Sequence, residues 1–419
     1  MRNLNSMRGA LCAVAVALSS SGAVAGDIDK QDFNQIERGR YLTVVGDCAA
    51  CHTLPGSGRT LAGGRPIETP FGNILAPNIS PDQQTGIGAW TDAEFVEAMT
   101  KGTGRNGRHL YPAMPYTYYT KITRDDALAI RAYLNTIPAV YNPVNANQLP
   151  FPFNIRASMI FWNKLFFTPG IFQPATDKSE EWNRGAYLAE GLGHCGLCHT
   201  PKNFLGGDKA SERLQGYALQ GWFASDITSD PHRGVGAWSV DEIANYLKTG
   251  HSRTSVANGP MSETLNLSTS RMTDADLKAI AVYLKDPQVR NANQSQSVSV
   301  APDQAVMKVG AKIYADECSG CHMANGKGSA NLFPALDGSA VVQQTDVTSI
   351  LHIVLRGARS VATDRAPTGP AMPEFGWLLK DDEVAAVVTY IRNSWGNAAS
   401  SVSAAEVGKA RQAFVERSD

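Results

Sequence analysis

The segment Cys48-Ala49-Ala50-Cys51-His52 brings two thiols and an imidazole together within a short stretch of chain. The same Cys-x-x-Cys-His pattern returns twice, at Cys195-Gly196-Leu197-Cys198-His199 and at Cys318-Ser319-Gly320-Cys321-His322. This pattern is typical of covalent haem c attachment, in which the two thiols form thioethers and the adjacent His ligates the iron. A redox-active dithiol, a zinc site and a short disulfide are the competing interpretations of each pair. Three copies favour haem, because a redox dithiol requires neither the His nor repetition, and a zinc site requires further ligands at matching spacing.

A methionine next to proline follows each copy of the motif. Residues 112–115 and 370–373 share the tetrapeptide Pro-Ala-Met-Pro, and residues 259–262 read Gly-Pro-Met-Ser. Met114 and Met261 both lie 62 residues after the His of their own motif, and Met372 lies 50 residues after its own. Met is the usual second ligand of electron-transfer haems, and proline disfavours the helix in which a core Met would pack. We therefore predict three haem sites, with the attachment residues Cys48, Cys51, Cys195, Cys198, Cys318 and Cys321 and the axial pairs His52/Met114, His199/Met261 and His322/Met372.

The other histidines are weaker candidates for the iron. His194 directly precedes Cys195, too close to reach the opposite haem face, so we place it in a pocket or on the surface. His109 and His251 lie shortly before Met114 and Met261. Each either contacts a haem edge or is an exposed loop histidine, and the sequence leaves both interpretations open. None replaces methionine as the predicted ligand.

Internal repetition extends beyond the ligands. Residues 78–82 and 86–91 (Asn-Ile-Ser-Pro-Asp and Gly-Ile-Gly-Ala-Trp-Thr) correspond to residues 226–230 and 234–239 (Asp-Ile-Thr-Ser-Asp and Gly-Val-Gly-Ala-Trp-Ser). Each unit is predicted to hold a helix before its Cys pair, a middle helix that begins at a cap residue, and a last helix after its Met. The predicted caps are Thr91, Ser239 and Thr345, and the last helix of the first unit carries the apolar stripe Ile130, Tyr133, Leu134 and Ile137.

A glycine lies within the first predicted helix of every unit, at Gly39, Gly185 and Gly310. Because Gly lowers helix propensity, we interpret these positions as points where the first helix closely crosses the last helix, near Tyr133, Tyr283 or Tyr390. The alternative is simple tolerance of Gly near a helix start. The close crossing resembles that of small c-type cytochromes. The predicted fold is therefore all-α, with three tandem class I-type cytochrome c domains at residues 26–140, 179–286 and 303–397.

The first 25 residues (1–25) read as a cleaved export signal. Arg2 and Arg8 provide a positive start, residues 9–18 are apolar, and residues 23–25 (Ala-Val-Ala) form a cleavage site. The stretch is too short for a membrane span, which needs about 20 apolar residues. Cleavage removes Cys12 and leaves six cysteines, all of them in the three motifs. The mature chain is therefore predicted to be exported and to have no membrane-spanning segment.

Three segments join or follow the predicted domains. Residues 141–178 form a connector rich in proline and aromatic residues, residues 287–302 a flexible Asn/Gln/Ser-rich linker, and residues 398–419 a polar tail with a weakly amphipathic helix candidate. Flexible linkers are polar, so the apolar connector must be buried against something. It either holds the first two domains together, which we favour, or docks on a partner or a membrane surface.

Composition limits the function classes. Hydrophobic residues make up 43% of the 419 residues, charged residues 18%, and the formal net charge is −1. These values exclude a disordered chain and argue against a nucleic-acid-binding protein. The sequence has no Rossmann fingerprint and no recognisable catalytic triad, so we assign no catalytic residue. Six-coordinate His/Met iron leaves no open position for substrate chemistry and suits one-electron relay.

The three motifs, residues 86–90 (Gly-Ile-Gly-Ala-Trp) and residues 107–116 (Gly-Arg-His-Leu-Tyr-Pro-Ala-Met-Pro-Tyr) together resemble the triheme cytochrome c subunit of bacterial membrane-associated dehydrogenases for alcohols, gluconate, sorbitol, fructose and aldehydes. The resemblance covers the mature chain and implies the same axial pairs. It also implies a large flavoprotein or quinoprotein dehydrogenase subunit as partner, often a small third subunit, and ubiquinone as acceptor. The implied location is the periplasmic face of the cytoplasmic membrane, with peripheral association. Some members carry a longer apolar C-terminal anchor, whereas the tail of this chain is short and polar.

Two other functions stay open from the sequence. The chain is also compatible with the cytochrome subunit of a molybdenum hydroxylase that acts on N-heterocycles or aldehydes, or with a free periplasmic electron carrier. The identity of the neighbouring genes, or of co-purifying proteins, would separate these alternatives.

Overall fold

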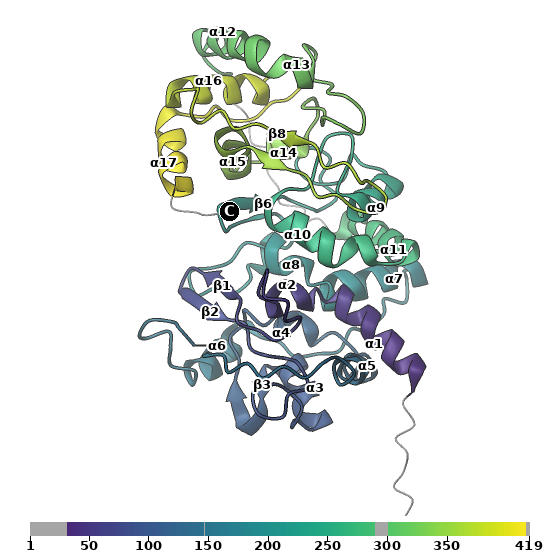
Figure 1. The fold of residues 1–419 in the computed structure, drawn as a ribbon. Coiled ribbons are helices and arrows are strands. Elements are labelled where there is room, and N and C mark those ends of the chain that lie inside the picture. Colours follow the sequence, from purple (N-terminus) through teal and green to yellow (C-terminus); the bar gives the residue numbers. More distant parts are fainter. Residues whose placement is uncertain (1–31, 146, 290–300, 416–419) are drawn as a thin grey trace, which may run out of the picture.

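The computed structural model describes residues 32–145, 147–289 and 301–415 (Figure 1). The predicted export signal and most of the predicted linker 287–302 lie outside these residues. The described chain is mainly helical, as predicted, and its strands form short two-stranded hairpins that the sequence did not predict. Within the described ranges, no helix has both the length and the apolar character needed to cross a membrane.

The first unit (32–140) and the connector contain the following elements in chain order: α1 (Phe33–Val45), α2 (Cys48–His52), β1 (Pro66–Thr69), β2 (Gly72–Leu75), α3 (Asp92–Lys101), β3 (Thr103–Gly104), η1 (Arg105–Gly107), β4 (Arg108–His109), α4 (Tyr116–Tyr119), α5 (Arg124–Leu134) and, in the connector, α6 (Ser158–Phe166). The antiparallel hairpins pair β1 with β2 and β3 with β4. Both hairpins lie between the first Cys pair and Met114.

Over the described residues 179–286, the second unit has a similar order of helices but only one hairpin. It contains α7 (Glu180–Tyr187), the π-helical turn η2 (Leu188–Leu192), α8 (Cys195–His199), η3 (Ala210–Glu212), β5 (Tyr217–Leu219), β6 (Trp222–Ala224), α9 (Val240–Thr249), α10 (Gly259–Leu267), η4 (Thr269–Arg271) and α11 (Asp274–Leu284), followed by η5 (Pro287–Val289). The third unit (303–397) and the tail contain α12 (Gln304–Ile313), η6 (Tyr314–Cys318), α13 (Ser319–His322), α14 (Ala340–Gln343), α15 (Thr348–Arg356), β7 (Ala358–Arg359), β8 (Ala371–Met372), α16 (Asp381–Arg392) and α17 (Ala404–Val415). Strand β5 pairs with β6, and β7 pairs with β8.

The middle helices of the first two units begin at the predicted caps. Thr91 and Ser239 each form a capping box with the glutamate three residues later, and this satisfies backbone N–H groups at the helix start. The predicted cap Thr345 is wrong. Helix α15 begins at Thr348, and its first N–H donates to the Asp346 carboxylate at 2.8 Å, because that side chain lies nearer the open helix end.

Each first helix crosses the last helix of its own unit at the predicted glycine. A Cβ atom on Gly39 would lie 1.8 Å from the carbonyl oxygen of Ala129 in α5, and one on Gly310 would lie 2.2 Å from that of Ala386 in α16. Gly185 lies in the same relation to α11. Because no side chain fits at these distances, the close-crossing interpretation is confirmed in all three units. Helix α5 ends at Leu134, so Ile137 of the predicted stripe lies beyond the helix.

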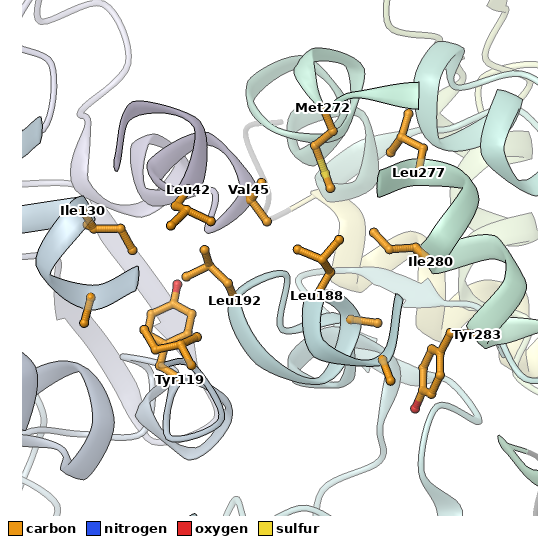
Figure 2. Close-up of a cluster of buried hydrophobic side chains, with 14 of the residues drawn as sticks. Leu42, Val45, Tyr119, Ile130, Leu188, Leu192, Met272, Leu277, Ile280 and Tyr283 are labelled. Carbon is orange, nitrogen blue, oxygen red and sulfur yellow. The ribbon is translucent and has the colours of Figure 1, made fainter. Parts of the chain in front are cut away.

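The first and second units share one hydrophobic core (Figure 2). Leu42 and Val45 of α1 belong to the same buried cluster as Leu188 and Leu192 of η2. The third unit has a separate core, to which α15, α16 and α17 contribute. Helix α17 confirms the helix candidate in the tail and buries Phe414 in this second core. The three repeats are therefore packed as a pair and a single unit.

The connector contacts both members of the pair, as the favoured alternative predicts, but its burial is incomplete, since Phe151, Phe161 and Leu165 remain exposed. The Tyr116 hydroxyl of the first unit donates to Asn163 Oδ1 at 2.7 Å, and Trp162 Nε1 donates to the Leu205 carbonyl of the second unit at 2.9 Å. Phe172 packs edge-on against Tyr187 at the start of the second unit, with ring centroids 5.8 Å apart. Helix α6 therefore joins the first two units along one side of the molecule (Figure 1).

Candidate haem sites

The first two Cys-x-x-Cys-His motifs form equivalent short helices, and the third spans the end of the π-helical turn η6 and α13. Helices α2 and α8 begin at Cys48 and Cys195 and end at the motif His, and α13 carries Cys321 and His322. Residues three apart lie on the same side of a helix, so the two thiols of each pair are directed to one side. The six cysteines in the described residues are all free thiols, so the structure does not support the disulfide interpretation.

The electrostatic environment of the thiols differs from that of a redox dithiol. Burial raises the pKa of Cys48, Cys51 and Cys195 to about 12 and that of Cys318 to about 11. Burial also raises the pKa of Cys198. Redox-active Cys-x-x-Cys pairs have a lowered thiol pKa, which supplies the nucleophilic thiolate. The pKa of these five thiols is shifted in the opposite direction, so the redox interpretation is not supported.

Each motif histidine is oriented by one backbone carbonyl. His52 Nδ1 lies 2.7 Å from the Pro77 oxygen, His199 Nδ1 2.6 Å from that of Ser225, and His322 Nδ1 3.0 Å from that of Pro334. A carbonyl only accepts, so Nδ1 carries the proton and Nε2 keeps its lone pair for a metal. Burial lowers the pKa of all three imidazoles and so favours the neutral form that ligates metals. Two thiols and one oriented, neutral imidazole are the donor set that a covalently attached haem requires, so the residues present fit this group.

Sequence reasoning missed the carbonyl partners, although the internal repeat contained the signal. Pro77 and Ser225 directly precede the repeated residues 78–82 and 226–230. Within that block, Asn78 Oδ1 accepts from the Ser80 N–H at 2.9 Å, and Asp226 Oδ1 accepts from the Thr228 N–H at 2.8 Å. These side-chain turns hold the backbone that presents the carbonyl to the imidazole.

The predicted methionines occupy three different local structures. Met114 lies in a turn, where its N–H donates to the Tyr111 oxygen at 3.0 Å, and it packs against the same core as Cys48. Met372 lies in β8 and packs against the same core as Cys318. Met261 does not lie in the predicted loop, because Pro260 is tolerated in a first helical turn and α10 begins at Gly259. Met261 belongs to neither core cluster.

Three of the other histidines lie between the units. His194 is stacked on Tyr119 of the first unit, with ring centroids 5.6 Å apart, so it is an interface residue. His251 Nε2 lies 3.0 Å from Ser360 Oγ of the third unit. His352 is stacked on Trp222 of the second unit at 4.0 Å. Sequence reasoning missed these contacts, because they join residues of different units.

Comparison with known proteins also indicates a c-type cytochrome. The cytochrome c family profile matches residues 36–138 and 307–395. The chain is 37% identical to the gluconate 2-dehydrogenase cytochrome c subunit of Pantoea cypripedii, over 95% of this chain and 94% of that protein. It is 36% identical to the cytochrome c subunit of the quinone alcohol dehydrogenase of Gluconacetobacter polyoxogenes, over 97% of this chain and 90% of that protein. It is also 39% identical to one subunit of the nicotinate dehydrogenase of Pseudomonas putida, over 85% of this chain but only 30% of that protein. The chain therefore belongs to the family of cytochrome c subunits of bacterial gluconate and quinone-dependent alcohol dehydrogenases.

Proposed function

We propose that this chain relays electrons one at a time from a dehydrogenase subunit to ubiquinone, through three covalently bound haems in three tandem cytochrome c domains. The observation that carries the proposal is the threefold recurrence of one donor arrangement: a Cys pair on a helical turn, followed by a His whose Nδ1 is held by a carbonyl. The family profile matches two segments of the chain. The same arrangement in α7, α8, α9 and α11 supports a further domain between them.

When bound, haem iron supplies reversible one-electron oxidation and reduction. The residues of this chain attach and orient it. The cysteines of each motif hold the group covalently, the motif His supplies Nε2, and Met114, Met261 and Met372 are the proposed second ligands. With the motif His and a Met both bound to the iron, no coordination position would remain for an organic substrate. Substrate oxidation is therefore assigned to a separate flavoprotein or quinoprotein subunit, and a small third subunit completes the proposed complex.

The location at the periplasmic face of the cytoplasmic membrane is also a proposal. It is supported by the export signal read from residues 1–25 and by an exposed apolar surface around α6, which we call the α6 face. Phe161 and Leu165 lie one helical turn apart and are 70% and 68% exposed. Phe151 of the same connector is 77% exposed, and Phe204, which precedes the Leu205 carbonyl bonded to Trp162 of this helix, is 86% exposed. A group of exposed apolar side chains on a water-exposed helix is typical of peripheral attachment to a lipid surface.

One observation favours a second function, that of a hydroxylase cytochrome subunit. This observation is the 39% sequence identity with one subunit of the nicotinate dehydrogenase of Pseudomonas putida. On that alternative, the chain corresponds to the cytochrome part of a hydroxylase for an N-heterocycle, and the remaining length of the relative would belong to another chain. Purification of the chain with its native partner separates the two: a flavin or quinone cofactor supports the first function, and a molybdenum cofactor supports the second.

Deletion of this chain tests the relay itself. The dehydrogenase partner should still reduce an artificial dye with its substrate, whereas substrate-dependent reduction of ubiquinone should disappear. The isolated chain should oxidise no organic substrate. Substrate turnover by this chain alone would contradict the assignment, and so would undiminished ubiquinone reduction in its absence.

A further inference from the structure

The first two units contact each other through reciprocal polar bonds. The Tyr41 hydroxyl of α1 donates to Asp276 of α11 in the second unit at 2.6 Å. The Tyr187 hydroxyl of α7 donates to Asp126 of α5 in the first unit at 2.5 Å. Each aspartate also pairs with an arginine of its own unit, Asp126 with Arg38 and Asp276 with Arg184. The two units are therefore related by an exchange of equivalent contacts, in addition to sharing one core (Figure 2).

The same exchange reaches the first Cys-x-x-Cys turn. Arg65 donates to the carbonyl oxygen of Ala50, which lies between Cys48 and Cys51. Arg65 also forms a two-point ion pair with Glu263 of the second unit, with 2.8 Å between Arg65 Nη2 and Glu263 Oε2. Glu263 lies in α10, two residues after Met261. The methionine-bearing helix of the second unit is thus tied, through one guanidinium, to the haem-attachment turn of the first.

The second Cys-x-x-Cys turn is held in the mirrored way. Lys202 Nζ lies 3.2 Å from the carbonyl oxygen of Gly196, between Cys195 and Cys198, and 2.5 Å from Asp208 Oδ1. The other oxygen of Asp208 accepts from the Tyr118 hydroxyl of the first unit. Tyr118 follows Met114 by four residues, and its ring lies so close to Gly196 that a Cβ there would be 2.8 Å away.

Both linkages have the same order: a turn carbonyl, a cation of the same unit, a carboxylate, and the methionine segment of the opposite unit. The linkages are partly shielded from water, since the Arg65 and Lys202 side chains are only 25% and 10% exposed. Charges in such positions are less screened than surface charges. Each linkage therefore connects a side chain of one unit to the haem-attachment turn of the other.

We propose that Glu263 and Tyr118 are positioning residues for the haem of the opposite unit, so that a side chain of each of the first two units sets the potential of the other unit's haem. Glu263 acts through Arg65 on the turn that holds the first haem, and Tyr118 acts through Asp208 and Lys202 on the turn that holds the second. This inference rests on the proposed haem binding, but it does not depend on the identity of the partner or acceptor.

The test is the Glu263→Gln variant of the full chain, purified with covalently attached haem and titrated against potential in the absence of any partner. The haem signals are assigned beforehand from the variants Met114→Ala and Met261→Ala. Loss of the Glu263 carboxylate removes the ion-pair partner of Arg65, which contacts the first haem-attachment turn, and a less neutralised cation at that turn favours the reduced iron. The reduction equilibrium constant of the first haem should rise about tenfold, equivalent to about 59 mV for a one-electron couple.

Asp241→Asn is the matched control, because it removes the same charge from an exposed residue of the same unit. Asp241→Asn should leave the reduction equilibrium constant of the first haem unchanged. The inference would be overturned if Glu263→Gln left the reduction equilibrium constant of the first haem unchanged, or if Asp241→Asn shifted that constant by the same amount. The titration needs no partner, so failure of the dehydrogenase to reduce the wild-type chain, with the expected shift present in Glu263→Gln, would count against the proposed function alone.

Tyr118→Phe provides the second arm and decides the question if Glu263→Gln does not assemble. It keeps the ring against Gly196 but removes the hydrogen bond to Asp208, so the carboxylate keeps more of its negative field near the second haem. The reduction equilibrium constant of the second haem should fall, and that of the first should stay unchanged. Tyr133→Phe in α5 is the control, since it removes a hydroxyl of the same unit outside the linkage. An unchanged reduction equilibrium constant of the second haem in Tyr118→Phe would contradict the proposal.

Discussion

The backbone of Gly185 lies directly against the carbonyl oxygen of Ala279: a Cβ atom on Gly185 would be 1.9 Å from that oxygen. The first and last helices of the second unit can cross at this distance only because Gly185 has no side chain. Gly185→Ala should therefore force the helices apart and lower the free energy of unfolding by at least about 1–3 kcal/mol. Denaturant unfolding monitored by circular dichroism measures this loss. Gly170→Ala is the control, because a Cβ there meets nothing within 4 Å, and equal stability of the two variants would contradict the crossing argument.

Covalent haem content is the most direct prediction for the sites. The chain produced with a cytochrome maturation system should carry three haems that survive denaturation. Replacing Cys318 and Cys321 together by Ala should leave two, because thioether bonds are formed only by these thiols in the third unit. Intact mass spectrometry counts the groups. A mass with free thiols in all three motifs, or with bound zinc, would exclude the haem assignment.

The second ligands are tested one methionine at a time. Met114→Ala, Met261→Ala and Met372→Ala should each remove about one third of the Met-to-iron charge-transfer absorbance and lower the potential of one haem, since Met ligation raises the potential. Met261 is the most informative position, because it lies in α10 and outside both core clusters. Should Met261→Ala retain the full absorbance, another residue would be the ligand in the second unit.

The shared core predicts joint unfolding of the first two units. Leu192 is fully buried, and its Cδ1 atom would lie 3.1 Å from a Cβ on Gly46 of the first unit. Leu192→Ala should cost about 2–5 kcal/mol and lower the unfolding midpoint of both units together. Differential scanning calorimetry separates this transition from that of the third unit. The matched change Val388→Ala, in the separate core, should lower only the third unit's midpoint, and the opposite pattern would refute a shared core.

The α6 face predicts binding to lipid. Replacing Phe161 and Leu165 together by Ser removes the most exposed apolar pair of the helix and should reduce co-sedimentation with phosphatidylcholine–phosphatidylglycerol vesicles several-fold, because binding scales with buried apolar area. Trp377→Ser is the control, since Trp377 is also highly exposed but lies in the third unit, outside the α6 face. Equal loss in both variants would assign the effect to general surface polarity.

Much of each site was readable from the sequence because the chemistry is local. A thioether pair and its His require Cys, Cys and His at fixed short spacing, so the motif alone predicts the attachment residues. The caps Thr91 and Ser239 were predictable for the same reason, since a capping box lies within four residues. The crossing glycines were also recognisable, because a poor helix former in a helix needs a steric reason. Thr345 failed because Asp346, one residue later, competes for the same helix end.

Only the tertiary structure decided how the three repeats are combined. The sequence shows three similar units, but it does not show that α1 and η2 bury their apolar side chains in one core while the third unit forms another. Arg65 and Glu263 are 198 residues apart, and Tyr118 and Asp208 are 90 apart, so no periodicity or motif connects them. Local chemistry determined which residues are predicted to hold a haem. The packing of distant segments determined which haem sites lie within reach of each other's charges, because Coulomb interactions depend on distance in space and not on distance along the chain.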